Sequence, residues 1–326
     1  MFKISAILLT ALMFGACMND VPHENPLDPD SEDFVETGIV RGDVRTFYQP
    51  RESIHGVKIE LWPGNITTES DSSGDFNIRN VPVGDYWITA HRAEFASDST
   101  RITVNQEEVA RVEFQLDALP KIQNVIGKTF HLADEESGDD VFFAHFEVKA
   151  DDPDGPGDVA GIITELTVAN RIDSMQATSR TGVFDLQIFA NDLAEGVFQR
   201  LPGHRILFTA IDRLGKKSAT MELFLVRIID ESPVIASPTD NAIVNDRPVL
   251  TWETIDLSFP FNFRVQVDRL RGGIRRPVWT SEEIPSFQTS ITLDQSLTAN
   301  DYIWTVAIED EFENTSISQP AAFKVE

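Results

Sequence analysis

Residues 71–88 read DSSGDFNIRNVPVGDYWI, and this stretch decides the fold class. The Ser-Gly pair that ends at Gly74 supplies the positive-φ turn of a hairpin, and Phe76 then returns the chain to a core. Pro82 and Gly84 set a second tight turn before the next apolar positions. Apolar and polar residues alternate beside both turns, which is the pattern of half-buried strands. The stretch therefore predicts short strands joined by tight turns.

The same pattern extends through most of the chain. From residue 37 onward, short alternating runs are separated by Gly, Pro, Asn and Asp, and no long run has the helical period. The composition agrees, because 18 Gly and 17 Pro suit many turns and Phe outnumbers Tyr 22 to 3. With 326 residues, two or three cores can form. We expect an all-β protein of three tandem β-sandwich modules, with boundaries near residues 119 and 230.

The first module, residues 37–119, carries an ordered set of motifs. After an opening G-x-V come G-V-x-I-x-L at residues 56–61, D-x-x-G-x-F at 71–76 and V-P-x-G-x-Y at 81–86. The module resembles the carboxypeptidase regulatory-like domain, a transthyretin-like β-sandwich grouped with carbohydrate-binding-like folds. The resemblance implies an accessory domain, found with peptidases and envelope receptors, that has no catalytic residues of its own.

The second module, residues 120–230, resembles an immunoglobulin-like bacterial surface module. Its features are alternating strand candidates and two turns rich in Asp and Gly, at residues 151–158 and 212–215. The expected strands cover residues 141–150, 162–168, 184–189, 205–210 and 218–229.

The third module, residues 231–326, resembles a fibronectin type III domain of bacterial envelope proteins. The pattern L-x(4)-Y-x-W-x-V places Tyr302 and Trp304 on one face of a late strand, and Trp252 lies on an early strand. We expect these aromatic residues to be inward core residues. The alternative is that Trp304 is a binding aromatic residue.

The N-terminal residues 1–17 read MFKISAILLTALMFGAC. Lys3 precedes an apolar run that is too short to span a bilayer but fits a secretory signal. Small residues then precede Cys17, the only cysteine of the chain, which excludes an internal disulfide. The segment resembles a bacterial lipoprotein signal peptide with its lipobox, which implies that Cys17 is acylated and becomes the first residue of the mature chain. The alternative is an ordinary signal peptide with an incidental cysteine.

Charge is distributed unevenly along the chain. Residues 18–36 contain seven acidic residues, no Lys or Arg, and three Pro, which predicts a disordered tether. The whole chain has 53 acidic against 27 basic residues, for a formal charge of −26. This balance argues against nucleic acid as a partner, because phosphate binding depends on Lys and Arg.

A calcium site in the loop 151–158 is the main candidate for a metal centre, ahead of the acidic run 134–140. Asp151, Asp152, Asp154 and Asp158 offer hard oxygen ligands within one loop rich in Gly and Pro. The spacing is not that of an EF-hand, since no Glu stands at the twelfth position. The alternative is an ordinary acidic turn between two strands.

The sequence offers no sign of catalysis. It contains no G-x-S-x-G elbow, phosphate-binding glycine loop or H-E-x-x-H motif, and its six histidines stand singly. We therefore expect no catalytic residues and no cofactor other than calcium.

Two functions remain open, with a third in which the modules are only spacers. The first is a lipid-anchored, non-enzymatic protein of the bacterial cell envelope, in the outer membrane, whose modules bind a protein or glycan partner or act as a scaffold. The second is an accessory or substrate-binding subunit of an envelope enzyme such as a peptidase.

Overall fold

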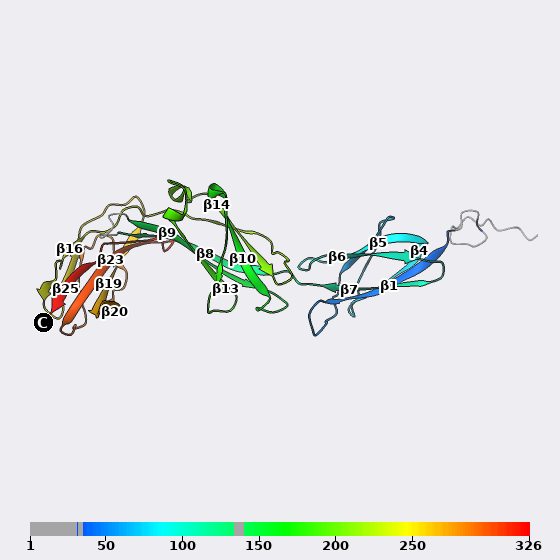
Figure 1. Ribbon diagram of the computed structural model, residues 1–326, viewed down its shortest axis with the longest axis horizontal. Helices are drawn as coiled ribbons and strands as arrows, with labels where there is room; N and C mark the ends of the chain where they lie inside the picture. Colours follow the sequence, from blue (N-terminus) through cyan, green and yellow to red (C-terminus); the bar gives the residue numbers. More distant parts are fainter. Residues whose placement is uncertain (1–30, 32–34, 134–139) are drawn as a thin grey trace, which may run out of the picture. The chain divides into compact units, whose positions relative to one another are not determined.

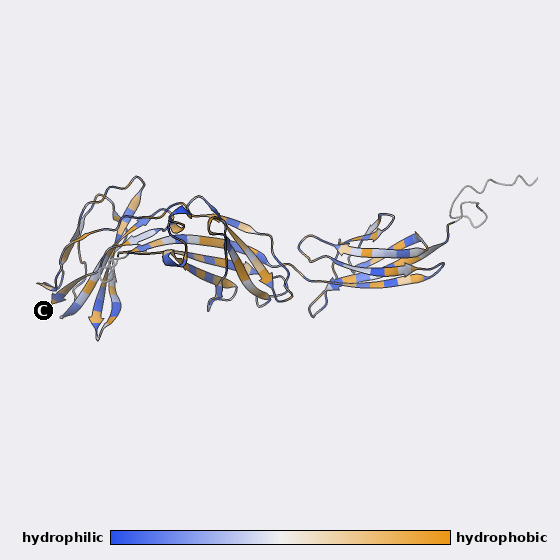
Figure 2. Cartoon of the chain, turned by 45° about the horizontal axis from the view of Figure 1, so that its top comes forward, coloured by the Kyte–Doolittle hydropathy of each residue, from blue (hydrophilic) through white to orange (hydrophobic). Residues whose placement is uncertain are grey.

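The computed structural model describes residues 31, 35–133 and 140–326. Cys17, the expected signal peptide and tether residues 18–30 and 32–34 lie outside the described residues. The described residues form β-strands and three 3-10 turns, η1 (Thr167–Ala169), η2 (Ala190–Asp192) and η3 (Phe198–Arg200), with no α-helix among them. None of their helical segments has the length and apolarity needed to cross a bilayer. The expected all-β class is confirmed, and apolar and polar residues alternate along the strands in Figure 2.

The chain divides into two compact units, residues 1–116 and 117–326. Unit 1 contains a three-stranded and a four-stranded sheet around one core (Figure 1). The first sheet has the order β4 (Asp75–Pro82), β1 (Thr37–Thr46), β7 (Val109–Leu116), and the second has β3 (Ile66–Glu69), β2 (Lys58–Trp62), β5 (Gly84–His91), β6 (Asp98–Val104).

Two glycines of unit 1, Gly42 and Gly74, lie where a side chain would not fit or would strain the backbone. Gly74 has φ +79°, as its place in the hairpin turn predicts. Gly42 lies on β1 opposite Val112 of the neighbouring β7, and a Cβ atom there would come within 2.0 Å of the Val112 carbonyl oxygen and 2.5 Å of the Phe76 ring. Both positions therefore require a residue without a side chain.

Unit 2 begins with two four-stranded arrangements that enclose a second core. The Phe146 ring on one sheet and the Phe208 ring on the other lie 5.7 Å apart across this core. One arrangement has the order β12 (Gln176–Ala177), β13 (Val183–Phe189), β9 (Val141–Asp151), β8 (Lys121–Leu132), and the other has β11 (Arg171–Ser174), β10 (Val159–Leu166), β14 (Arg205–Asp212), β15 (Met221–Phe224).

The remaining strands enclose a third core, in which Trp252 packs edge-on against Phe263 at 5.4 Å. Trp252, Tyr302 and Trp304 are all buried, as the sequence predicts. The Trp304 indole donates a hydrogen bond to the Pro238 carbonyl, so it is a core residue and not an exposed binding aromatic. One sheet has the order β16 (Ile235–Ser237), β18 (Val249–Trp252), β22 (Ser290–Thr292). The other has the order β24 (Thr315–Ile317), β23 (Asn300–Asp310), β19 (Phe261–Arg271), β20 (Ile274–Thr280). Three short strands extend it: β21 (Ile284–Pro285) pairs with β19, β25 (Ala321–Val325) pairs with β23, and β17 (Ala242–Val244) pairs with β25.

The chain does not divide again at residue 230, because one sheet runs through both parts of unit 2. β24 pairs in parallel with β8, with Thr315 opposite Phe130 and Ile317 opposite Leu132. Beside this pairing, the Asn314 side chain accepts hydrogen bonds from the amide and the hydroxyl of Thr129. The second and third cores therefore share a continuous sheet, which the sequence does not predict.

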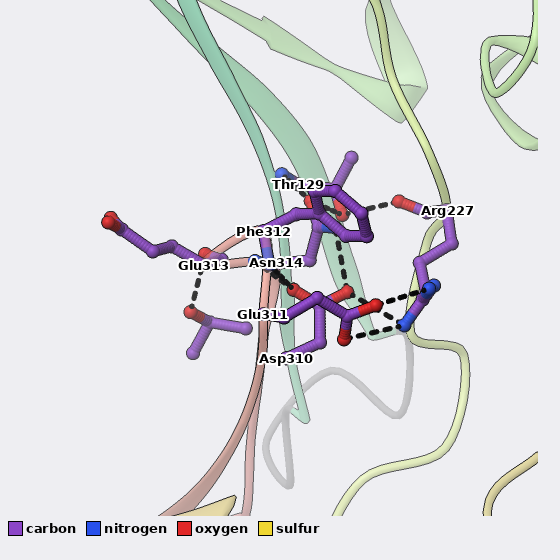
Figure 3. A network of polar contacts seen from close by, with 8 residues as sticks. Thr129, Arg227, Asp310, Glu311, Phe312, Glu313 and Asn314 are labelled. Atoms are coloured by element: carbon purple, nitrogen blue, oxygen red, sulfur yellow. Dashed lines mark hydrogen bonds and ion pairs between the residues drawn. The ribbon is translucent and has the colours of Figure 1, made fainter. Parts of the chain in front are cut away.

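A buried ion pair adds to this junction (Figure 3). Asp310, whose side chain is fully buried, accepts a hydrogen bond from the Asn314 amide group and lies 3.3 Å from Arg227. Arg227 also pairs with Glu311 at 3.1 Å and stacks over the Phe259 ring at 4.3 Å. Each charged group at the junction thus has a partner.

Two strands of unit 2 differ from the sequence prediction. The run 218–229 forms a strand only over β15 (Met221–Phe224). β8 was not expected, because a register shift between Ile122 and Asn124 interrupts its period of two.

Candidate metal centre

The acidic loop of the second module connects β9 to β10 at one end of this sandwich. Its backbone folds into two successive turns, in which Gly155 donates to the Asp152 carbonyl and Asp158 donates to the Gly155 carbonyl, both at 2.9 Å. Gly155 has φ +125°, a value that favours glycine. The turns bury Asp152 and Asp158 and leave Asp154 half-buried.

Two further aspartates join this loop from distant parts of the sequence. Asp117 opens unit 2 just before β8, and the amide of its neighbour Ala118 donates a 2.9 Å hydrogen bond to Asp154 Oδ2. Asp212 ends β14, and the following amide, of Arg213, donates to the Asp158 carbonyl at 3.1 Å. Five aspartates from three segments therefore meet at one end of the sandwich.

The carboxylates are close enough to share one cation. One carboxylate oxygen each of Asp117, Asp154 and Asp158 lies within 4.8 Å of the other two. No His or Cys of the described residues belongs to this group. Oxygen ligands at such separations suit a calcium ion, which accepts six to eight oxygens at about 2.3–2.6 Å.

Burial leaves several of these oxygens without a hydrogen bond. Asp117 is only 4% exposed, yet neither of its carboxylate oxygens accepts a hydrogen bond from a described residue. Asp152 and Asp212 use Oδ1 to accept backbone amides, from Asp154 and from Leu214 and Lys216. Oδ2 of both has no such partner. A buried charge without a partner is costly, so this arrangement points to a ligand with positive charge.

Equivalent turns elsewhere in the chain provide an internal comparison. Asp71, Asp212 and Asp310 each accept two backbone amides through Oδ1, from the residues two and four positions later. Of the two buried members, Asp310 has its second oxygen paired with Asn314 and Arg227. The second oxygen of Asp212 has no hydrogen-bond partner among the described residues, and the Asp212 charge acts on Asp117, which is the difference that a cation would explain.

Burial, together with the neighbouring charges, raises the pKa values of two aspartates in the cluster. Burial, followed by the charges of Asp212, Asp154, Asp158 and Asp152, raises the pKa of Asp117 to about 7. Burial also raises the pKa of Asp152 to about 6, although the hydrogen bond from the Asp154 amide opposes the shift. Without a cation, these carboxyl groups therefore retain protons far above the usual range of aspartate.

The structure brings together three of the four aspartates that the sequence predicts as calcium ligands. Asp152, Asp154 and Asp158 meet in the cluster, whereas Asp151 ends β9 and accepts hydrogen bonds from the Asp152 amide and the Gln123 side chain. The sequence does not predict that Asp117 and Asp212 join the cluster. The turn that begins at Asp212 is visible in the sequence, but its position beside the loop depends on the pairing of β10 with β14.

One group of side chains resembles a hydrolase triad. His131 lies 2.8 Å from Asp140 through Nε2 and 3.0 Å from the Ser316 hydroxyl through Nδ1. Ser316 is fully buried between β8 and β23, and the His131 ring stacks on Phe142 at 4.1 Å. A substrate cannot reach this hydroxyl, so the group contributes to the junction within unit 2 and not to catalysis.

A family model and several solved structures are similar to parts of the chain. Residues 39–117 match the carboxypeptidase regulatory-like domain. The match covers most of the first module, which is therefore similar to this domain over nearly its whole length. No curated protein shows significant similarity to the chain.

The similar solved structures have low identity. GBS52, the minor pilin of Streptococcus agalactiae, is 18% identical to the chain, with a TM-score of 0.24. The match covers 27% of this chain and 47% of the pilin, so the chain spans less than half of that structure. BcpA, the major pilin subunit of Bacillus cereus, is 10% identical over 89% of this chain and 96% of its own, with a TM-score of 0.31. The FN1–FN3 domains of chicken CNTN1 are 8% identical over 90% of this chain and 99% of their own, with a TM-score of 0.35.

Proposed function

We propose that the chain is a lipid-anchored, non-catalytic protein of the bacterial cell envelope whose β modules bind a partner or act as a scaffold, with calcium holding one end of the second module in shape. The observation that carries this proposal is the buried Asp117, whose two carboxylate oxygens accept no hydrogen bond from a described residue while one of them lies within 4.8 Å of Asp154 and Asp158 oxygens. A structural cation accounts for this arrangement, whereas an exposed acidic turn does not.

Calcium would link three segments of unit 2 that lie far apart in the sequence. The segment at Asp117, the loop 152–158 and the turn after Asp212 all supply carboxylates to the same point. A bound ion would offset their repulsion and stabilise the folded state by mass action. A site of this kind suits a scaffold, because it orders a module without requiring a reactive group.

Hydrogen exchange tests this part of the proposal. We expect calcium to slow amide exchange at residues 152–158 and 213–216, and to leave the equivalent turn after Asp71 in unit 1 unchanged. If calcium leaves the exchange rates at residues 152–158 and 213–216 unchanged, the proposal is contradicted.

The lipid anchor is proposed from the sequence around Cys17. A single cysteine follows two small residues at the end of a short apolar run, and more than one acyl chain gives stable membrane attachment. The acidic residues 18–36 would then act as a spacer, and the anchor would lie in the outer membrane. Cys17→Ser should release the protein from the membrane fraction or leave it unprocessed. An unchanged mature mass and unchanged membrane association in the variant, with no lipid on either form, would contradict this assignment.

A second candidate function rests on the match of residues 39–117 to the carboxypeptidase regulatory-like domain. The name of this family favours a role as accessory or substrate-binding subunit of an envelope peptidase. Crosslinking in native envelopes, followed by purification through the chain, distinguishes the two functions: a peptidase recovered in fixed ratio supports the accessory role, and its absence supports the independent scaffold.

A further inference from the structure

Two tryptophans lie side by side on the outer face of unit 1, away from its core. Trp62 is 63% exposed and Trp87 is 42% exposed. They are direct cross-strand partners in the antiparallel pair of β2 and β5. Adjacent exposed indoles of this kind contribute little to the core, so they suggest a binding surface.

The surroundings make this pair distinctive. All other outward residues of β2, β5 and β6 are polar or charged: Lys58, Glu60, Asp85, Thr89, His91, Ser99, Arg101 and Thr103. Arg101, opposite Trp87 on β6, lies 4.6 Å above its ring. This contact holds the indole in place, because a guanidinium over an aromatic face is attractive.

Two polar residues, Asp85 and Thr103, lie beside the indoles on the same face of the sheet. Asp85 and Thr103 are cross-strand partners one step along the same face, and the Thr103 hydroxyl donates a 2.6 Å hydrogen bond to Asp85. Together with Trp62, Trp87 and Arg101, they line an open pocket of about 370 Å³. The pocket thus has an apolar floor with donors and acceptors at its edge, which is the usual composition of a small-molecule site.

The geometry points to a glycan-binding site on this face, in which a neutral sugar ring stacks on Trp62 and Trp87. A sugar ring presents apolar C–H groups on one face and hydroxyl groups around its rim, which matches an indole floor bordered by Asp85, Thr103 and Arg101. The site favours a neutral ligand, since the chain carries a net charge of −26 and the Arg101 cation already contacts Trp87. This inference names the partner class of the binding role proposed above.

The test uses the chain without residues 1–17 on an array of neutral and anionic bacterial glycans. We expect binding to a subset of neutral glycans, and a loss of affinity of about tenfold or more in Trp62→Ala and in Trp87→Ala. Phe287→Ala is the matched control, because Phe287 is an 86% exposed aromatic residue of unit 2, and its binding should equal that of the unaltered chain. No glycan binding, or equal binding by all three variants, would overturn the inference.

A second readout does not depend on how the variants fold. Of the five tryptophans, Trp62 and Trp87 should show the largest shifts of their indole N–H resonances when the array-selected glycan is added. Shifts confined to other tryptophans would overturn the site. Shifts of these two indoles with a proline-rich peptide and not with glycans would overturn it in favour of a peptide groove. Calcium binding is measured on the same sample, so failure of the glycan site is distinguishable from failure of the proposed calcium centre.

Discussion

The amide of Ala118 donates a 2.9 Å hydrogen bond to Oδ2 of Asp154, a residue 36 positions later in the chain. This bond brings Asp117 beside the acidic loop, where its carboxylate meets those of Asp154 and Asp158. The cluster is therefore a product of tertiary structure and not of one loop. A cation at this point would join the start of unit 2 to the loop between β9 and β10.

Replacement of Asp117 by asparagine should separate the effects of charge and calcium. At a pH above about 7, where Asp117 is ionised, Asp117→Asn removes one buried charge that repels four others, so the calcium-free variant should melt at a higher temperature than the unaltered chain. It also removes a ligand, so calcium should raise its melting temperature much less. Thermal melts with and without calcium measure both effects.

Asp71→Asn provides the matched control for that experiment. Asp71 occupies the same position in its turn as Asp212 does, but it lies in unit 1 and is exposed. The control should keep the full calcium response of unit 2. A calcium response retained by Asp117→Asn, or lost in Asp71→Asn, would argue against the centre.

The stability of the calcium-free protein should depend on pH in a specific direction. The pKa of Asp117 is about 7 in the folded state against an ordinary value of 3.8, so the folded state binds more protons between these values. Stability therefore decreases as pH rises from about 4 to about 7, by at most about 1.4 kcal/mol per pH unit for this group. Denaturant melts of the unaltered chain and of Asp117→Asn give the difference. A slope that is the same in both proteins would exclude Asp117 as its source.

Removal of Arg227 should weaken the junction within unit 2. Arg227→Ala leaves the fully buried Asp310 carboxylate without its cation, which we expect to lower the free energy of unfolding by about 3–5 kcal/mol. Arg180→Ala, which removes an exposed pair with Glu147, should change it by less than about 1 kcal/mol. Urea denaturation compares the two variants, and similar losses in both would contradict the role of the junction.

Trp252 tests whether the last two cores unfold together. Trp252→Ala deletes a side chain that is 3% exposed and packed on Phe263, at an expected cost of about 3–5 kcal/mol. The shared sheet predicts that both cores of unit 2 are destabilised while unit 1 is unchanged. Calorimetry resolves the transitions, and Phe287→Ala, on the surface, should shift none of them. Loss of the third core alone would show that β8 and β24 do not couple the two cores.

The sequence predicts the local parts of this structure well. The hairpin at Gly74 and the inward positions of Trp252 and Trp304 follow from turn chemistry and a period of two, which act between near neighbours. Pairings between distant strands leave no such pattern. The contact of Thr129 with Asn314 joins residues 185 positions apart, and the bulge in β8 conceals the strand that makes it.

The candidate site shows the same limit. The loop aspartates are visible because they are adjacent in sequence, and the turn at Asp212 is visible because of its Asp and Gly residues. Asp117 stands alone between two strands, so only the fold brings it to the cluster. The exposed pair of Trp62 and Trp87 depends in the same way on the register of β2 with β5.

Titration calorimetry at about pH 7 tests the central claim, that calcium occupies the aspartate centre of unit 2. The chain without residues 1–17, freed of metal, should bind one calcium ion with a dissociation constant of about a millimolar or below, and magnesium more weakly. The double variant Asp117→Asn with Asp212→Asn should show no such binding. Absence of binding heat for the unaltered chain, together with no calcium-dependent shift in melting temperature at millimolar calcium, would contradict the claim.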